Sequence, residues 1–284
     1  CKADVTCDKR YKNKFLAIHA NENEQIDYKR TYNVFKNKEI SPNFAANLKS
    51  GEALRALFLS IFKEIKRLKS DYLQDHDEEI LHSLRVNLRK VRSLLKIFNG
   101  VFDEKVTLFF GENFKILANS TNKKRDLDIF LSFLSEQKHA NELIYFVQKA
   151  LNLEYENVKS YLSDEENYAF LKEWEIFLNE GEFYGSKLFD VSLSRLGSFK
   201  LRTLMVLVQK RLKSLDQDCP NESFHKIRIE LKKVRYTYEF LSEIFYFDGL
   251  KKYEERLKDM QEIFGALQDY DVWLGILERL PEAA

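Results

Sequence analysis

The segment HSLRVNLRKVRSLLKIF, residues 82–98, decides the fold, because HKIRIELKKVRYTYEFL at residues 225–241 repeats its pattern. Apolar residues recur every three or four positions in both segments, which is the spacing of an amphipathic helix. Two such helices far apart in one chain indicate an internal repeat. The aligned pairs are His82 with His225, Arg85 with Arg228, Arg89 with Lys232, Lys90 with Lys233, and Arg92 with Arg235.

The repeat extends beyond these two basic segments. The same offset carries Asp126 and Asp128 onto Asp269 and Asp271. Upstream, a slightly longer offset pairs Arg55 with Arg202 and Lys66 with Lys213. The sequence therefore predicts four parts: a polar tail or remnant of an upstream segment at 1–50, repeat 1 at about 51–140, an insert or linker at 141–197, and repeat 2 at about 198–284.

The composition favours an all-α protein. Nine glycines and three prolines in 284 residues are too few for the turns of a sheet protein, whereas 44% hydrophobic residues can build a large core. No apolar run approaches the length of a membrane span. Three cysteines without a pattern fit a reducing cytosol, so we expect a cytoplasmic protein with no disulfide or zinc site. The expected helices are 52–70, 78–98, 104–118, 123–138, 142–162, 165–179, 198–215, 222–247, 249–264 and 270–280.

Positive charge is concentrated in a few segments, although the net charge is only +1. Residues 82–96 and 198–215 each contain five Lys or Arg side chains and no acid. The rest of the chain must therefore be acidic on balance. Such segregation of charge predicts a cationic site in a protein with an anionic surround.

The cations of the first segment share one helix face. His82, Arg85, Arg89, Arg92 and Lys96 follow one another at intervals of three or four residues, over about 21 Å of helix. Like charges on one face reduce stability, and exposed helices usually mix the two signs. Arginine also binds phosphate oxygens through its planar fork. The stripe therefore indicates a site for an extended polyanion, against the alternative of a solvated basic face.

The paired acids Asp126 and Asp128, with Asp269 and Asp271, admit two interpretations. Residues two apart on a helix face different directions, which makes each pair a poor clamp for a metal ion. Capping a helix or orienting the cations of the stripe is the other role for such acids. No motif for a nucleotide-binding loop or a catalytic nucleophile is present. We expect no catalytic residue, no metal site and no cofactor.

The doubled pattern H-x-x-R-x-x-x-[RK]-[RK]-x-R, with RDLD and LQDYD downstream, resembles the CHAD domain, the conserved histidine α-helical domain. The resemblance covers about residues 45–280. It implies two four-helix-bundle-like subdomains related by a pseudo-twofold axis, with basic stripes lining a central cavity or pore. It also implies binding of inorganic polyphosphate without turnover, association with polyphosphate granules, and a triphosphate-tunnel (CYTH) domain as a possible partner.

Three rival functions stay open at this point. A nucleic-acid binder would use the same cations, but it is the less favoured reading because no aromatic residue accompanies the stripe for base stacking. A metal-dependent phosphohydrolase acting on polyphosphate and a protein-interaction scaffold are the others. The predicted central polyphosphate contacts are Arg85, Arg89, Arg92, Arg228, Lys232 and Arg235. A second tier comprises His82, Lys90, Lys96, His225 and Lys233, and the remaining candidates are Arg55, Lys66, Arg202 and Lys213.

Overall fold

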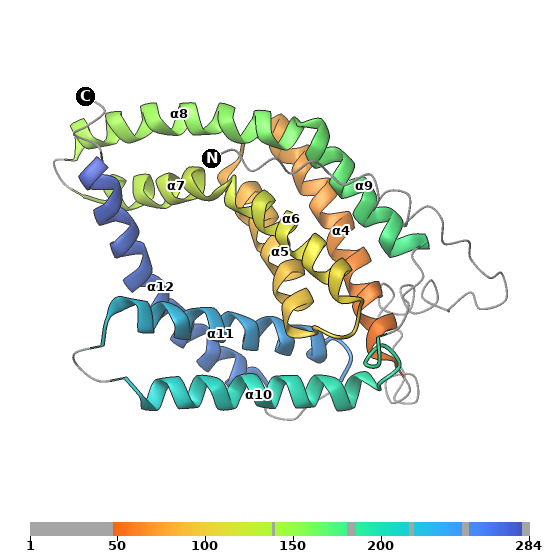
Figure 1. Ribbon diagram of the computed structural model, residues 1–284. Helices are drawn as coiled ribbons and strands as arrows, with labels where there is room; N and C mark the ends of the chain where they lie inside the picture. Colours follow the sequence, from red (N-terminus) through yellow and green to blue (C-terminus); the bar gives the residue numbers. More distant parts are fainter. Residues whose placement is uncertain (1–47, 138–139, 181–185, 216–218, 246–249, 280–284) are drawn as a thin grey trace.

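The structure is a computed structural model that describes residues 48–137, 140–180, 186–215, 219–245 and 250–279. Helices form almost all of this part of the chain, which confirms the all-α prediction (Figure 1). An isolated antiparallel bridge joins Lys49 to Ser192. The predicted tail lies almost wholly outside the described residues. The helices are α4 (Ser50–Asp75), α5 (Glu78–Ile97), α6 (Glu104–Asn119), α7 (Asn122–Ser135), α8 (Asn141–Ser163), α9 (Glu165–Glu180), α10 (Leu193–Lys213), α11 (Asn221–Ser242) and α12 (Leu250–Arg279).

Local capping explains the sharp connection between α4 and α5. His76 takes a left-handed conformation, with φ of 58°, and ends α4. The next residue, Asp77, caps α5 by accepting hydrogen bonds from the backbone N–H groups of Glu79 and Ile80. A two-residue connection of this kind makes neighbouring helices antiparallel, and α4 and α5 indeed pack together.

The last helix is longer than the sequence predicts. We expected a break between residues 264 and 270, whereas α12 continues through this stretch. Gly265 lies within this stretch, and a Cβ atom at its position would have open space around it. Ala266, Leu267 and Gln268 follow it and all favour helix. A single glycine costs about 1 kcal/mol in a helix interior, and packing at both ends of α12 offsets that cost.

Helix α10 also begins earlier than predicted, at Leu193 rather than near residue 198. Gly197 consequently lies within the helix and not in a linker. A Cβ atom at this position would lie 2.5 Å from the Cδ2 atom of Leu241. Glycine therefore allows α10 to approach the end of α11 closely.

The main core lies among α4, α5, α6 and α9. Trp174 of α9 is fully buried, and its ring centroid lies 4.7 Å from that of Phe110 and 5.1 Å from that of Phe114. The predicted insert therefore contributes part of the first half's core. Phe240 and Leu241, at the end of α11, extend this core towards the second half.

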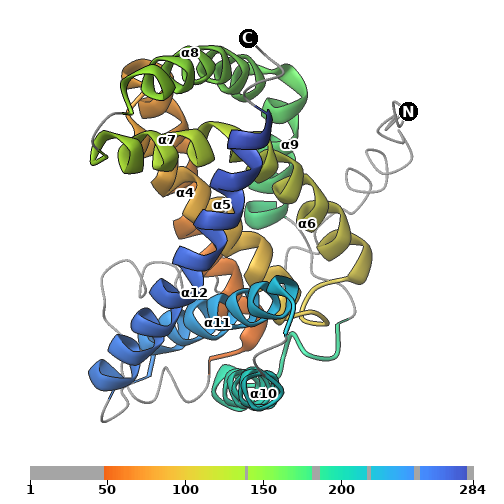
Figure 2. The ribbon, with the colours of Figure 1, turned by 90° about the vertical axis from the view of Figure 1, so that its left-hand side faces the viewer.

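Two smaller hydrophobic clusters position α12. Near its start, Leu257, Met260 and Phe264 pack with side chains of α10 and α11. Near its end, Trp273 and Ile276 pack with side chains of α7 and α8. Figure 2 shows α12 running diagonally from α11 to α7. One helix thus connects the two halves of the fold.

Candidate functional site

The apolar face of α5 is buried as the periodicity predicts. Leu84, Leu88, Val91 and Leu94 are at most 1% exposed. This packing fixes the rotation of α5 and turns its basic face away from the core. Helix α11 packs against α5, and its own apolar face is buried through residues such as Leu231. The two repeated segments therefore contact one another.

Arg85 is buried within the protein rather than exposed on its surface. It is 5% exposed. Its Nη1 donates to Thr121 Oγ1 at 2.6 Å and to the Ala118 carbonyl at 3.2 Å, and its Nη2 donates to Asn122 Oδ1 at 2.9 Å. Burial, with repulsion from Arg89, lowers the pKa of Arg85 to about 10. Arg85 thus fastens α5 to the α6–α7 junction as well as supplying charge.

Cations from α5 and α11 converge where the helices pack. Burial lowers the pKa of Lys232 to about 7, and repulsion from Arg228, Arg89 and Arg235 contributes. Asp269 acts in the opposite direction. Burial also lowers the pKa of Arg228. We call the following side chains the central cation cluster: Arg85, Arg89, Arg228, Lys232 and Arg235.

Two repeat-related acids, Asp126 of α7 and Asp269 of α12, lie close to this cluster. Burial raises the pKa of each, while Arg85 lowers that of Asp126 and Arg228 lowers that of Asp269. The two carboxylates also repel one another, which raises the pKa of Asp126 further. Both acids therefore serve as counter-charges to the cations, as in the second interpretation of these pairs. Within the described ranges, no group of three or more His, Cys, Asp or Glu side chains is placed to hold a metal ion.

The other acid of each pair has a structural role. Asp128 is buried and forms an ion pair with Lys124, with 2.5 Å between carboxylate and ammonium. Asp271 accepts a hydrogen bond of 3.0 Å from the side-chain amide of Asn221, which links α12 to the start of α11. The two members of each Asp pair thus point to different environments.

The two predicted histidines differ in their surroundings. His82 is half-buried, and its pKa is lowered by burial and by the neighbouring charges, of which Arg125 has the largest effect. The buried Nδ1 atom of His82 has no hydrogen-bond partner among the described residues. His225 instead contacts Gln268 of α12 through its ring Nδ1.

Arg125 is a residue of this site that the sequence analysis missed. Its guanidinium lies 3.9 Å from Glu79 and affects the pKa of His82, Arg85 and Asp126. The repeat offset pairs Arg125 with a glutamine, so matching cations in the two halves could not find it. Arg125 is the first residue of the RDLD segment, directly before Asp126, and this position is the feature of the sequence that could have identified it.

The glutamates of the second segment partly neutralise their neighbours. Lys233 pairs with Glu230 at 2.8 Å. The Nε atom of Arg235 lies 3.2 Å from Glu239, and its Nη1 donates to Gln261 Oε1 at 2.7 Å. Lys233 and Arg235 are therefore both engaged in contacts within the protein.

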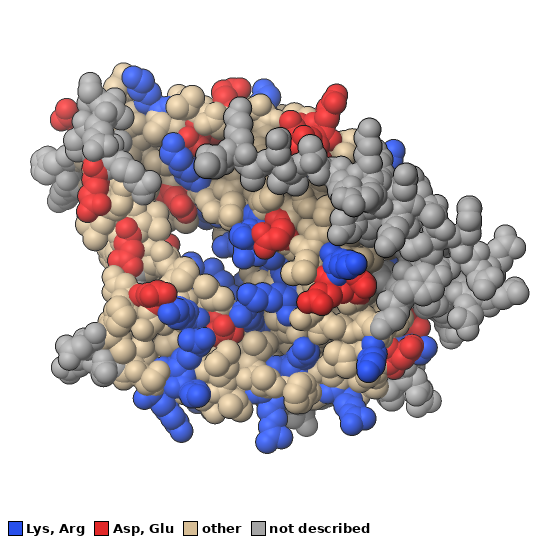
Figure 3. Space-filling view, in the orientation of Figure 1, with Lys and Arg blue, Asp and Glu red and all other residues tan. Residues whose placement is uncertain are grey.

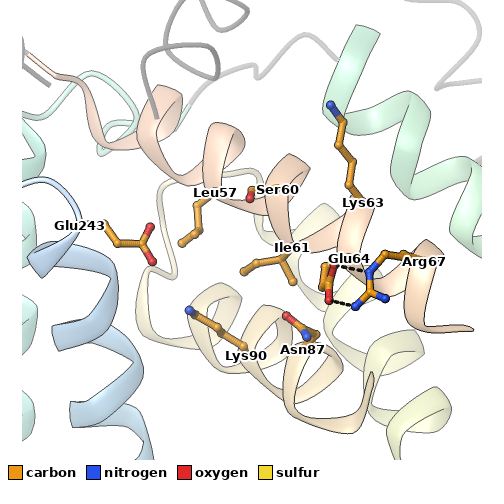
Figure 4. Close-up of a pocket in the computed structure, with 9 residues that line it drawn as sticks. All are labelled: Leu57, Ser60, Ile61, Lys63, Glu64, Arg67, Asn87, Lys90 and Glu243. Atoms are coloured by element: carbon orange, nitrogen blue, oxygen red, sulfur yellow. Dashed lines mark hydrogen bonds and ion pairs between the residues drawn. The ribbon is translucent and has the colours of Figure 1, made fainter. Parts of the chain in front are cut away.

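Lys90 lies on a different side of α5 from the cluster's acids. It is 3.6 Å from Glu239 and lines a cleft of about 480 Å³ between α4, α5 and the end of α11. Figure 4 shows Lys90 extending from α5 towards the end of α11, where Glu243 lies, with Leu57 and Ile61 of α4 lining the same cleft. The structure therefore does not bring Lys90 to Asp126 and its neighbours.

The structure also places Arg55 and Lys66 elsewhere, contrary to the prediction. Arg55 is buried and donates from Nε to the Leu178 carbonyl at 2.6 Å. Lys66 pairs with Glu175 at 2.5 Å. Both partners belong to α9, a helix of the predicted insert.

The remaining predicted residues lie towards the periphery. Arg202 and Lys213 are exposed on α10. Arg92 and Lys96, at the far end of the α5 stripe, lower the pKa of Glu112 of α6, although Lys115 has the larger effect on it. The central cation cluster is thus smaller than the predicted set.

Lys and Arg side chains gather around a hollow in the middle of the face shown in Figure 3. Figure 1 places α7, α12, α11 and α5 around this position. Contacts of α5 with α11 and of α7 with α12 complete the ring of helices around the hollow.

The described residues contain no helix long and apolar enough to cross a membrane.

Comparisons with known proteins agree with this architecture. The chain is similar to the crystal structure of the CHAD domain from the plant Ricinus communis, with a TM-score of 0.74 and 24% identity over 84% of this chain and 81% of that one. It is also similar to PptA from Streptomyces chartreusis, with a TM-score of 0.56 and 13% identity over 78% and 87% of the two chains. No sequence among the curated proteins matches it. The family model of the CHAD domain matches residues 56–278, and the chain therefore belongs to the CHAD domain family.

Proposed function

We propose that the chain binds inorganic polyphosphate at the central cation cluster, without changing it chemically. The observation that carries the proposal is the convergence of Arg89 of α5 with Arg228 and Lys232 of α11, where the two helices pack together and their cations repel one another. Burial and neighbouring like charges make this site unfavourable when empty, and a bound polyanion offsets both effects. The sequence retains the arrangement on two helices despite its cost.

The proposed site is a basic cavity shared by two related halves. Arg85 and Arg228 occupy equivalent positions on α5 and α11, and Asp126 and Asp269 occupy equivalent positions on α7 and α12. Two helices that contribute equivalent charges from opposite sides suit a linear ligand with a repeating charge. The hollow of Figure 3 gives such a ligand a path between the halves.

Polyphosphate fits this chemistry better than a nucleic acid does. Single-stranded nucleic acids are held by aromatic side chains on which bases stack. The aromatic residue next to the cluster, Tyr236, is 2% exposed and packs in the core. The carboxylates that could hold a metal ion for hydrolysis, Asp126 and Asp269, are already counter-charges to arginines. Binding without turnover is therefore the simplest proposal.

A calorimetric titration tests the proposal with four ligands: long-chain polyphosphate, triphosphate, RNA and DNA. We expect long polyphosphate to bind most tightly, because triphosphate reaches only part of a stripe about 21 Å long. Equal or tighter binding of RNA or DNA would refute the assignment. Release of orthophosphate during the titration would show that the ligand is also hydrolysed.

Variants of each half test whether the site is shared. Arg89→Gln with Arg92→Gln removes one cation of the cluster and the next cation of the α5 stripe, and Arg228→Gln with Lys232→Gln removes two cluster cations of α11. A ligand that spans both halves gains affinity from the second contact. We therefore expect each double variant to weaken binding by more than about tenfold. Arg85 is left intact because its hydrogen bonds hold α5 to the α6–α7 junction.

A matched control removes the same charge elsewhere. Lys149 and Lys172 are exposed on α8 and α9, and Lys149→Gln with Lys172→Gln should leave affinity almost unchanged. A loss equal to that of the site variants would mean that only net charge matters. Unchanged affinity at half the stoichiometry in either site variant would instead reject a shared cavity.

A further inference from the structure

Helix α10 has an exposed face that combines apolar and basic side chains. Phe199 and Val206 are 64% and 56% exposed and lie seven residues apart, on the same side of the helix. Arg202 and Lys213 are exposed on this side too. The sequence of α10 contains no Asp or Glu. The opposite side packs on α11 through residues such as Val208.

Helix α12 has an exposed face of the opposite charge. Ile263, Tyr270 and Leu274 are 65%, 55% and 60% exposed, and Leu277 is 39% exposed. These four residues follow a spacing of seven, four and three, so they form one stripe along the helix. From residue 259 to residue 278 the helix contains no Lys or Arg, whereas Asp259, Glu262, Asp271 and Glu278 are exposed on it.

We propose that the α12 face of one molecule docks on the α10 face of a second copy of this chain. Both stripes extend over about 21 Å of helix, from 199 to 213 and from 263 to 277. One is basic and the other acidic, with apolar side chains along each. Opposite charge around an apolar centre is the pattern of complementary protein interfaces.

Within one molecule the two faces do not meet. Both helices pack on α11, and their apolar stripes are left exposed. In Figure 3, Lys and Arg follow the lower edge of the molecule, where Figure 1 draws α10, whereas Asp and Glu occur along the left-hand edge beside α12. The contact between copies is therefore head to tail, with a different face from each molecule.

A membrane surface is the other partner suited to a basic amphipathic helix such as α10. It would leave the apolar stripe of α12 without a partner, and the acids of α12 would be repelled by anionic lipid. A second copy covers both stripes at once, so the observations favour self-association. This proposal does not depend on polyphosphate binding.

Complementary variants test a head-to-tail contact. The first variant, Phe199→Glu with Val206→Glu, disables only the α10 face. The second, Ile263→Lys with Leu274→Lys, disables only the α12 face. Analytical ultracentrifugation without phosphate polymers should show that the wild-type chain self-associates and that each variant alone is a monomer. An equal mixture should form a dimer of one copy of each, because one intact α10 face and one intact α12 face remain.

The control places glutamate on exposed apolar positions outside both faces. Leu108 of α6 and Leu153 of α8 are 60% and 62% exposed, and Leu108→Glu with Leu153→Glu should associate like wild type. Circular dichroism of each variant should stay helical, and a variant that unfolds is replaced by the milder Phe199→Ser or Leu274→Ser. A monomeric wild-type chain, a mixture that stays monomeric, or association equally reduced by the control would overturn the proposal. The proposal would also be overturned if the α10 variant still self-associated but no longer bound anionic vesicles that the wild-type chain binds. The α10 face would then bind membranes and not a second copy.

Discussion

Lys232 should make polyphosphate binding depend on pH. Its pKa is about 7 in the free protein, below the ordinary 10.5, because of burial and because Arg228, Arg89 and Arg235 repel its positive charge. Asp269 is the carboxylate that opposes this effect. A polyanion bound at the cluster adds negative charge and raises the pKa of Lys232. The complex then holds more protons than the free protein above pH 7, so affinity falls as pH rises.

The size of the effect follows from how far the pKa recovers. Recovery by one unit lowers affinity about fivefold between pH 7 and pH 9, and full recovery to 10.5 lowers it about fifty-fold. Below pH 6 Lys232 is protonated in both states and contributes no dependence on pH. If the pKa recovers fully, the affinity falls by nearly tenfold per pH unit between pH 7 and pH 10.5, which corresponds to uptake of one proton on binding.

Calorimetry at pH 8 measures that proton directly, through titrations in buffers of different ionisation enthalpy. The control is Lys232→Arg, which keeps the positive charge at every accessible pH. Long-chain polyphosphate is used because its end groups, which titrate near neutrality, are few. The variant should lose much less affinity between pH 7 and pH 9 than the wild-type chain does. A wild-type affinity that is flat over this range, or equal proton uptake by the variant, would refute the reasoning.

Four other outcomes are expected. Log affinity for long polyphosphate should fall linearly with log salt concentration, by analogy with counterion release, and a slope near zero would rule out an electrostatic site. Gly51→Ala should lower the free energy of unfolding by about 1–3 kcal/mol, because its Cβ would lie 2.1 Å from the Phe189 ring. Gly111→Ala, with open space around the Cβ, should raise it by about 1 kcal/mol in the same urea titration. Arg89→Gln with Arg92→Gln should leave the melting temperature of the free protein unchanged or slightly higher, because like charges are removed, and a large decrease would identify these arginines as structural.

The sequence was most informative where the repeat and the helical period agreed. The helical spacing of residues 82–96 predicted which face of α5 is buried. Leu84, Leu88, Val91 and Leu94 occupy that face. The repeat offset drew attention to Asp126 and Asp269, which the structure places close enough to affect one another's charge. Periodicity specifies one helix face, and duplication specifies which residues of two helices are equivalent.

The sequence was less informative where contacts depend on helices outside the repeat. Nothing in the spacing of Arg55 and Lys66 shows that α9 covers them, because their partners Leu178 and Glu175 lie more than 100 residues further along the chain. Arg125 escaped notice since its repeat partner is Gln268. The continuity of α12 depends on packing at both of its ends, which local propensity around Gly265 does not contain.

The continuity of α12 has a consequence for the rate of binding. Repulsion among the cations of α5 and α11 favours separation of the two helices, and α12 resists this because it is packed on α11 at one end and on α7 at the other. We therefore expect the site to be assembled before a ligand binds. Without a closure step after the encounter, association should proceed at the rate of an electrostatically steered collision, above about 10⁷ per molar per second at low salt.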